Sequence, residues 1–113
     1  MHTTIYSEAL YGIDGIPIII EVNISEGLPK FDVVGLPDQA VNEARERVIA
    51  AINNGGRFFP PKRITINLAP ADIKKTGTLY DLAFALGILS SSAQIFFDDS
   101  MEKTIILGEL ALD

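Results

Sequence analysis

The sequence has no cysteine and a single histidine, His2. Without cysteine, the chain has no disulfide framework, no thiolate zinc site and no thiol nucleophile. With one histidine close to the N-terminus, it lacks the ligands of a multi-histidine metal site and the base of a histidine-dependent catalytic triad. The composition therefore argues against these kinds of metal and nucleophile chemistry.

Long apolar segments are also lacking. The longest apolar run covers residues 82–89, about eight residues, whereas a membrane-spanning helix needs about twenty. Residues 1–4 do not form a basic region followed by an apolar one, as a secretory signal would. We expect a cytoplasmic protein with no membrane partner.

The 113 residues are 48% hydrophobic and 21% charged, which is typical of one globular domain over residues 1–113. With a net charge of −6, the chain as a whole is not typical of a nucleic-acid-binding protein. The charge is uneven, because residues 57–80 carry a net +4 between flanks that each carry −5. Residues 104–112 run apolar to the end without a stop signal, which predicts a fragment of a longer protein.

Three segments have the features of strands: residues 3–11, 16–25 and 31–34. In the second segment, apolar residues occupy every second position from 18 to 24, the period of a half-buried strand. Short connections join the three segments, which predicts an antiparallel meander.

A helix is predicted after Pro37 and Asp38, since proline suits the first helical turn and a carboxylate suits its positive end. One apolar stripe follows at three- and four-residue steps: Val41, Ala44, Val48 and Ile52. Glu43 and Arg47 are spaced for an i,i+4 ion pair on the solvent side. Residues 53–56 are typical of a helix end.

The second half predicts three elements: a strand over residues 63–68, a helix over 79–91 and a last strand over 104–112. Thr78 and Asp81 form a variant of the capping box at the start of the helix. Gly87 costs about 1 kcal/mol of helix propensity, which indicates close approach of another backbone. Four residues of this helix are predicted to be core: Leu82, Ala85, Leu86 and Leu89. The order βββαβαβ predicts an α+β fold of two layers, with helices on one face of a mixed sheet.

The segment 74–78, KKTGT, has the residue types of a phosphate-binding loop in the wrong order, before a predicted helix N-terminus. It also places Thr76 and Thr78 near Lys74 and Lys75, the ingredients of a hydroxyl nucleophile with a lysine base. We interpret the segment as a solvated loop followed by a helix cap.

Asp98 and Asp99 are interpreted as a polar turn rather than a catalytic pair. We therefore predict no catalytic, cofactor-binding or metal-binding residues in this chain. Cations do flank the aromatic and proline residues 58–61, a combination typical of single-strand binding. The candidate nucleic-acid or docking surface consists of the five cations of the basic segment: Arg57, Lys62, Arg63, Lys74 and Lys75.

Longer motifs carry a resemblance to a known family. They are GLPDQAVNEARERV at residues 35–48, INLAPAD at 66–72, KTGTLYDL at 75–82, GLP at 27–29 and LGEL at 107–110. Together they resemble the N-terminal domain of magnesium-chelatase-like AAA+ ATPases of the competence-protein (ComM) type. The resemblance covers essentially the whole chain.

The resemblance implies a bacterial protein of several hundred residues, in which an AAA+ module with Walker motifs follows this domain. ATP and magnesium would bind that module, and no cofactor would bind this chain. The implied partners are the domain's own AAA+ module, further copies in a ring that is expected to be hexameric, and DNA, because the competence branch moves branched DNA with ATP. The implied fold is that of domain 2 of ribosomal protein S5, shared with the proteolytic domain of Lon.

In Lon-type proteases a serine begins the second helix and a lysine follows the last strand. In our alignment the serine position falls on Gly77, and the lysine position lies beyond Asp113. We therefore predict a non-catalytic binding and assembly domain of an ATP-driven DNA-remodelling ring. Two alternatives stay open: a Lon-like peptidase that uses Thr76 or Thr78 with a lysine, and a structural domain that only packs on its ATPase.

Overall fold

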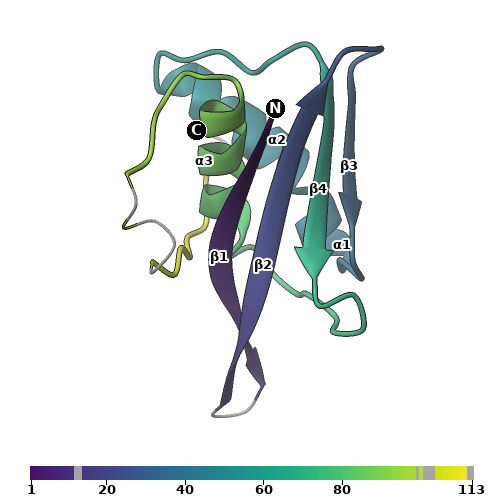
Figure 1. Cartoon of the computed structure of the whole chain (residues 1–113). Helices are drawn as coiled ribbons and strands as arrows, with labels where there is room; N and C mark the ends of the chain where they lie inside the picture. Colours follow the sequence, from purple (N-terminus) through teal and green to yellow (C-terminus); the bar gives the residue numbers. More distant parts are fainter. Residues whose placement is uncertain (12–13, 99, 101–103, 112–113) are drawn as a thin grey trace.

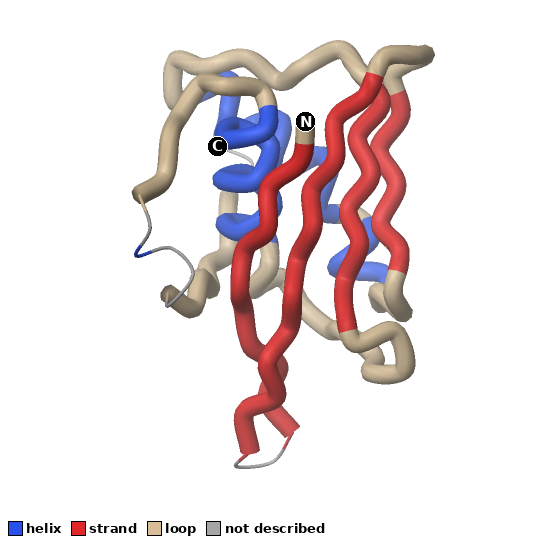
Figure 2. Tube along the Cα trace, viewed as in Figure 1, coloured by secondary structure: helices blue, strands red, loops and turns tan. Residues whose placement is uncertain are grey.

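The computed structural model describes residues 1–11, 14–98, 100 and 104–111. Four strands in the described residues form one sheet: β1 (His2–Tyr11), β2 (Asp14–Ser25), β3 (Lys30–Val34) and β4 (Arg63–Ala69). The same residues contain three helices: α1 (Gln39–Asn42), α2 (Ala44–Asn54) and α3 (Asp81–Ser91). All three helices lie on one side of the sheet (Figures 1 and 2), so the predicted two-layer α+β class is confirmed.

The sheet order is β1-β2-β4-β3, with β3 and β4 parallel and the other neighbours antiparallel. The predicted meander is therefore wrong, because β4 lies between β2 and β3. The apolar side chains Ile64 and Ile66 of β4 are fully buried, which suits a central strand. The prediction paired β3 with β2 because the two strands follow each other in the sequence. The residues of β3 that face the core are only half-buried, which suits a strand at the edge of the sheet.

One face of the sheet forms the core with the helices, and strand alternation decides which residues face it. The core includes these residues without exposed surface: Ile5, Ile18, Ile20, Val22, Val48, Ile64, Ile66, Phe84 and Ile88. The opposite face carries mainly polar side chains, such as Glu21 and Asn67, which are register partners. In the part of the chain that the structure describes, no helix covers this polar face (Figure 1).

The first predicted helix is present in two pieces. The stripe that begins at Val41 and ends at Ile52 is buried as predicted, and the Asp38 carboxylate caps α1 by accepting a hydrogen bond from Val41 N at 2.8 Å. Glu43 ends α1 and precedes α2. The predicted Glu43–Arg47 pair is wrong, because Arg47 turns inward to Asp81.

Helix α3 begins at Asp81, and its N-cap residue, Tyr80, makes no side-chain cap. The predicted capping box is wrong because Asp81 binds Arg47 instead. A Cβ on Gly87 would lie 2.5 Å from Val22 Cγ2. Gly87 is therefore in close contact with β2, but the predicted backbone neighbour is wrong, because the nearest atoms belong to a side chain.

The predicted core face of α3 needs a correction. Of its four residues only Ala85 is buried, while three leucines are half-buried on the side that faces α2: Leu82, Leu86 and Leu89. Phe84, Gly87 and Ile88 face the sheet instead. The helix is apolar on nearly all sides, so its sequence does not indicate which side faces the sheet.

The predicted last strand is also wrong. Residues 104–111 form one bridge, between Ile105 and Tyr6, and Ile106 N donates to Tyr6 O at 2.8 Å. The chain then leaves the edge of β1 because Gly108 binds the start of α3 instead. Its N–H donates to Leu79 O, and its carbonyl oxygen accepts from Leu82 N. Leu112 lies outside the described residues. In the described ranges no helix is long and apolar enough to span a membrane.

Candidate functional site

A buried lysine joins three loops at one end of the sheet. The Lys75 ammonium has no exposed surface and donates to the carbonyls of Gly35 at 2.7 Å, Leu68 at 3.5 Å and Pro70. We call this cluster, residues 35–38, 68–70 and 75–77, the lysine junction. Burial lowers the pKa of Lys75.

Asp38 completes the lysine junction. Its second carboxylate oxygen accepts from Gly77 N at 3.1 Å, and its backbone N donates to Lys75 O at 2.8 Å. Gly35 has φ +113°, and a Cβ there would lie 2.1 Å from Leu68 O. A glycine is required at this position, because the carbonyl that Lys75 binds occupies the space of a side chain.

A second polar contact is the pair between Arg47 of α2 and Asp81 of α3. Arg47 Nε and Nη2 donate to the two Asp81 oxygens at 2.6 and 3.0 Å, and Nη2 also donates to Ala40 O at 2.7 Å. The hydrogen bond to Asp81 raises the pKa of Arg47. Leu110 N donates to Asp81 as well, at 3.3 Å, so this pair also fixes the C-terminal segment.

Lys75 was predicted to lie on a basic surface, and this prediction is wrong. A lysine buries its ammonium when backbone carbonyls replace water, and three carbonyls do so here. The Nζ partners are carbonyl oxygens and not the hydroxyl of Thr76 or Thr78. A saturated ammonium of this kind has no free lone pair to activate a nucleophile.

The other four predicted cations do not share one surface. Lys62 and Arg63 lie at the start of β4, whereas Lys74 follows its end. Arg57 lies beside α3, where it donates to Gln94 O and lines a cavity with Leu86 and Leu89. The seven residues of β4 span about 20 Å at ~3.3 Å per residue. Lys74 lies instead in a small cavity that Glu8, Tyr80 and Leu107 also line.

Near the start of β4, the fold adds residues that the sequence analysis missed. A cavity of about 240 Å³ is lined by Pro29, Lys30, Phe31, Arg45, Phe59, Pro60, Pro61 and Lys62. We call these residues, with Phe58 and Arg63, the proline corner. The rings of Phe31 and Phe59 are 6.3 Å apart between centroids. Lys30 and Arg45 were missed because only the β3–β4 register and the start of α2 bring them here.

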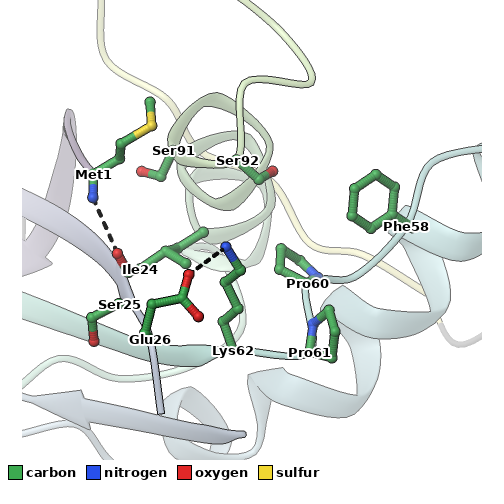
Figure 3. Close-up of a pocket in the computed structure, with 10 residues that line it drawn as sticks. All are labelled: Met1, Ile24, Ser25, Glu26, Phe58, Pro60, Pro61, Lys62, Ser91 and Ser92. Atoms are coloured by element: carbon green, nitrogen blue, oxygen red, sulfur yellow. Dashed lines mark hydrogen bonds and ion pairs between the residues drawn. The ribbon is translucent and has the colours of Figure 1, made fainter.

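A larger cleft, of about 500 Å³, adjoins the proline corner and shares Pro60, Pro61 and Lys62 with it. Figure 3 shows Met1 and Phe58 at opposite sides of this cleft. Lys62 Nζ contacts Glu26 at 3.0 Å. The Phe58 side chain is 58% exposed.

Among the described residues, no three His, Asp or Glu side chains gather as metal ligands would. Asp98 accepts hydrogen bonds from Ser100, and these lower its pKa. This contact agrees with a polar turn. Asp99 lies outside the described residues.

The fold and these contacts define a two-layer α+β domain in which the charged side chains of Lys75, Asp38, Arg47 and Asp81 hold loops and helices together. The family model described as subunit ChlI of Mg-chelatase matches residues 20–113. The chain therefore belongs to this family.

Individual relatives agree with this assignment. The chain is 49% identical over 108 residues to YifB of Salmonella typhimurium and 44% identical over 108 residues to Rv2897c of Mycobacterium tuberculosis. It is 47% identical over 109 residues to competence protein ComM of Haemophilus influenzae. Each alignment covers 96% of this chain and 21% of the relative, so the chain spans about a fifth of the length of these proteins.

Proposed function

We propose that this chain is the non-catalytic N-terminal binding and assembly domain of a magnesium-chelatase-like AAA+ ATPase. The whole protein would be an ATP-driven ring, expected to be a hexamer, that remodels branched DNA in the cytoplasm. The observation that carries this proposal is the 47% identity to competence protein ComM over 96% of the chain.

The use of the motif residues supports a non-catalytic role. Lys75, Asp38 and the Arg47–Asp81 pair make contacts within the fold. The chain would bind no cofactor, whereas ATP and magnesium would bind the AAA+ module that follows it. Its partners would be that module, further copies of the ring and DNA.

The Lon-like alternative receives less support. A Ser/Thr–Lys peptidase needs a lysine that can accept a proton from a hydroxyl. Lys75, which is close to Thr76 and Thr78 in the sequence, does not suit this role because its ammonium is held by carbonyls. Gly77 stands at the expected nucleophile position and donates its N–H to Asp38.

Deletion of residues 1–113 from the full-length protein tests the proposal. We expect the truncated protein to retain ATP hydrolysis, since the Walker motifs would lie outside this chain, and to lose ring assembly or movement of branched DNA. The isolated chain should neither hydrolyse ATP nor react at Thr76 or Thr78 with a serine-directed probe. Loss of ATP hydrolysis with intact rings, or labelling of either threonine, would contradict it.

A further inference from the structure

The proline corner combines cationic and aromatic side chains in one cavity. Three cations line it, Lys30, Arg45 and Lys62, and none of the described residues that line it is acidic. The chain as a whole carries −6. Each of the three cations has a carboxylate partner outside the lining, so the lining itself is cationic, and a cationic lining favours an anionic ligand.

Two of the cations at the corner are strand neighbours. Lys30 and Arg63 are register partners of the parallel β3–β4 pair, so their side chains leave the uncovered face of the sheet, whereas their neighbours Phe31 and Ile64 face the core. Like charges in register positions repel each other. Among the described residues Arg63 has no ion-pair partner, while Lys30 has Asp32 at 3.6 Å. A phosphate between the two cations would replace this repulsion with attraction.

The remaining ion pairs of the corner are exposed and easily exchanged. The Arg45–Glu46 side chains are 49% and 72% exposed, and the Lys62–Glu26 side chains are 45% and 87% exposed. Exposed pairs of this kind contribute little to stability. Their cations can therefore turn to a phosphate at little cost.

The aromatic side chains indicate what accompanies the phosphate. Phe58 presents a ring that is 58% exposed, and Phe59 and Phe31 form the half-buried floor of the adjoining cavity. Aromatic faces beside cations hold unpaired bases by stacking, without dependence on sequence. Paired bases do not offer their faces in this way.

We propose that the proline corner binds a short segment of single-stranded nucleic acid. Its backbone passes over the starts of β3 and β4. Phosphates then contact Arg45 and Lys62 on the helix side and Lys30 and Arg63 on the uncovered side, and a base stacks on Phe58. The inference rests on the proposed function for its biological partner, since a ring that moves branched DNA meets unpaired strands. The site itself follows from the residues of the corner.

The test measures the affinity of the full-length protein for a fluorescent 20-nucleotide oligo(dT) by anisotropy. Lys30→Gln and Arg63→Gln should each weaken binding about threefold to fivefold, and the double variant at least tenfold. Lys74→Gln, which removes the same charge at the other end of β4, should change affinity less than twofold. With four phosphate contacts, the log–log salt slope should be about −3 and should fall to about −1.5 in the double variant.

Stacking is tested at Phe58. Phe58→Leu keeps the apolar bulk without the aromatic face and should weaken binding at least fivefold, whereas Phe58→Tyr should bind like the wild type. A duplex of equal length should bind at least fivefold more weakly than the single strand. Thermal unfolding of each variant shows that it is folded.

Four results would overturn the proposal. They are equal losses in Lys74→Gln and Arg63→Gln, no loss in Phe58→Leu, equal affinity for the duplex, and full displacement of the oligonucleotide by an acidic peptide of the same charge. ATP hydrolysis and ring assembly are measured on the same samples. If the wild type neither hydrolyses ATP nor assembles into rings, the proposed function is contradicted, but the affinities still test the binding site.

Discussion

The lysine junction and the proline corner use the same kinds of residue in opposite ways. At the junction, Lys75 is buried and saturated by carbonyls of the chain itself. At the corner, Lys30 and Lys62 are exposed and paired only with exposed carboxylates. A charge that is enclosed by its own backbone stabilises a fold, while an exposed charge is available to a ligand.

The residues that carry the family motifs and the residues of the proposed binding surface therefore lie in different regions of the fold. The junction contains several of the residues that carry the family resemblance, and their contacts fix loops and helix starts. The corner lies apart from the junction, at the other end of β4. Variants in the two regions should therefore fail in different ways, in stability at the junction and in binding at the corner.

The largest loss of stability is expected at the junction. Lys75→Met removes the donor of three carbonyls, and each buried acceptor left without a partner costs about 1–3 kcal/mol. We expect the free energy of unfolding of residues 1–113 to fall by about 3–5 kcal/mol in urea denaturation. The matched variant Lys74→Met should lose less than about 1 kcal/mol. Equal losses in the two variants would show that Lys75 is not enclosed.

The packing of α3 comes next. Ile88→Ala should cost about 2–5 kcal/mol, since Ile88 has no exposed surface and its truncation leaves a cavity. Leu86→Ala should cost less, about 1–2 kcal/mol, because Leu86 is half-buried on the side toward α2. Urea denaturation measures both values. The reverse order would mean that α3 presents a different face to the sheet.

The Arg47–Asp81 pair should contribute somewhat less to the free energy of unfolding than the core residue Ile88. Asp81→Asn keeps an acceptor for Leu110 N but removes the charge beside Arg47, whose side chain is only 17% exposed. We expect a loss of about 2–3 kcal/mol in unfolding free energy. The control Asp32→Asn, in an exposed pair, should lose less than about 1 kcal/mol. A loss below that of the control would exclude a structural role for the pair.

A smaller effect is expected from pH. Because burial lowers the pKa of Lys75 below its ordinary 10.5, the folded chain releases this proton before the unfolded chain does. Between the folded pKa and 10.5 the unfolded state binds more protons, so the unfolding free energy of the wild type rises with pH. Lys75→Met lacks this titration. The stability difference between the two proteins should therefore grow as pH rises toward 10.5, and a constant difference would contradict the lowered pKa.

The smallest change in stability is expected at the corner. Lys30→Gln with Arg63→Gln relieves repulsion between register partners and loses the exposed Lys30–Asp32 pair. These effects oppose each other, so the free energy of unfolding should change by less than about 1 kcal/mol. A loss as large as that of Lys75→Met would place these cations in the fold rather than at a binding surface.

Local patterns predicted much of this fold. The alternation of β2 and β4 and the stripe from Val41 to Ile52 follow from side-chain period alone, and the burial of these residues agrees. The position of β4 between β2 and β3 depends on which strands pair across long sequence separations. The rotation of α3 was hidden because nearly all of its sides are apolar.

The site was harder to predict than the elements. Arg47 and Asp81 are 34 positions apart, and Lys75 meets Gly35 across 40, so no local pattern connects them. An aspartate at the start of an almost wholly apolar helix was a usable signal for a buried partner. The cations beside residues 58–61 did indicate a basic region, but Lys30 and Arg45 join it only through the fold.

The most direct test of a domain that binds without catalysing is the ATP turnover of the full-length protein, measured with and without single-stranded DNA. In Lys30→Gln/Arg63→Gln, we expect basal turnover equal to that of the wild type, because the Walker motifs would lie in another module. Turnover in the presence of DNA should need at least tenfold more oligonucleotide to reach the same rate. Loss of basal turnover with unchanged DNA dependence would contradict the proposal, because this chain would then take part in the chemistry itself.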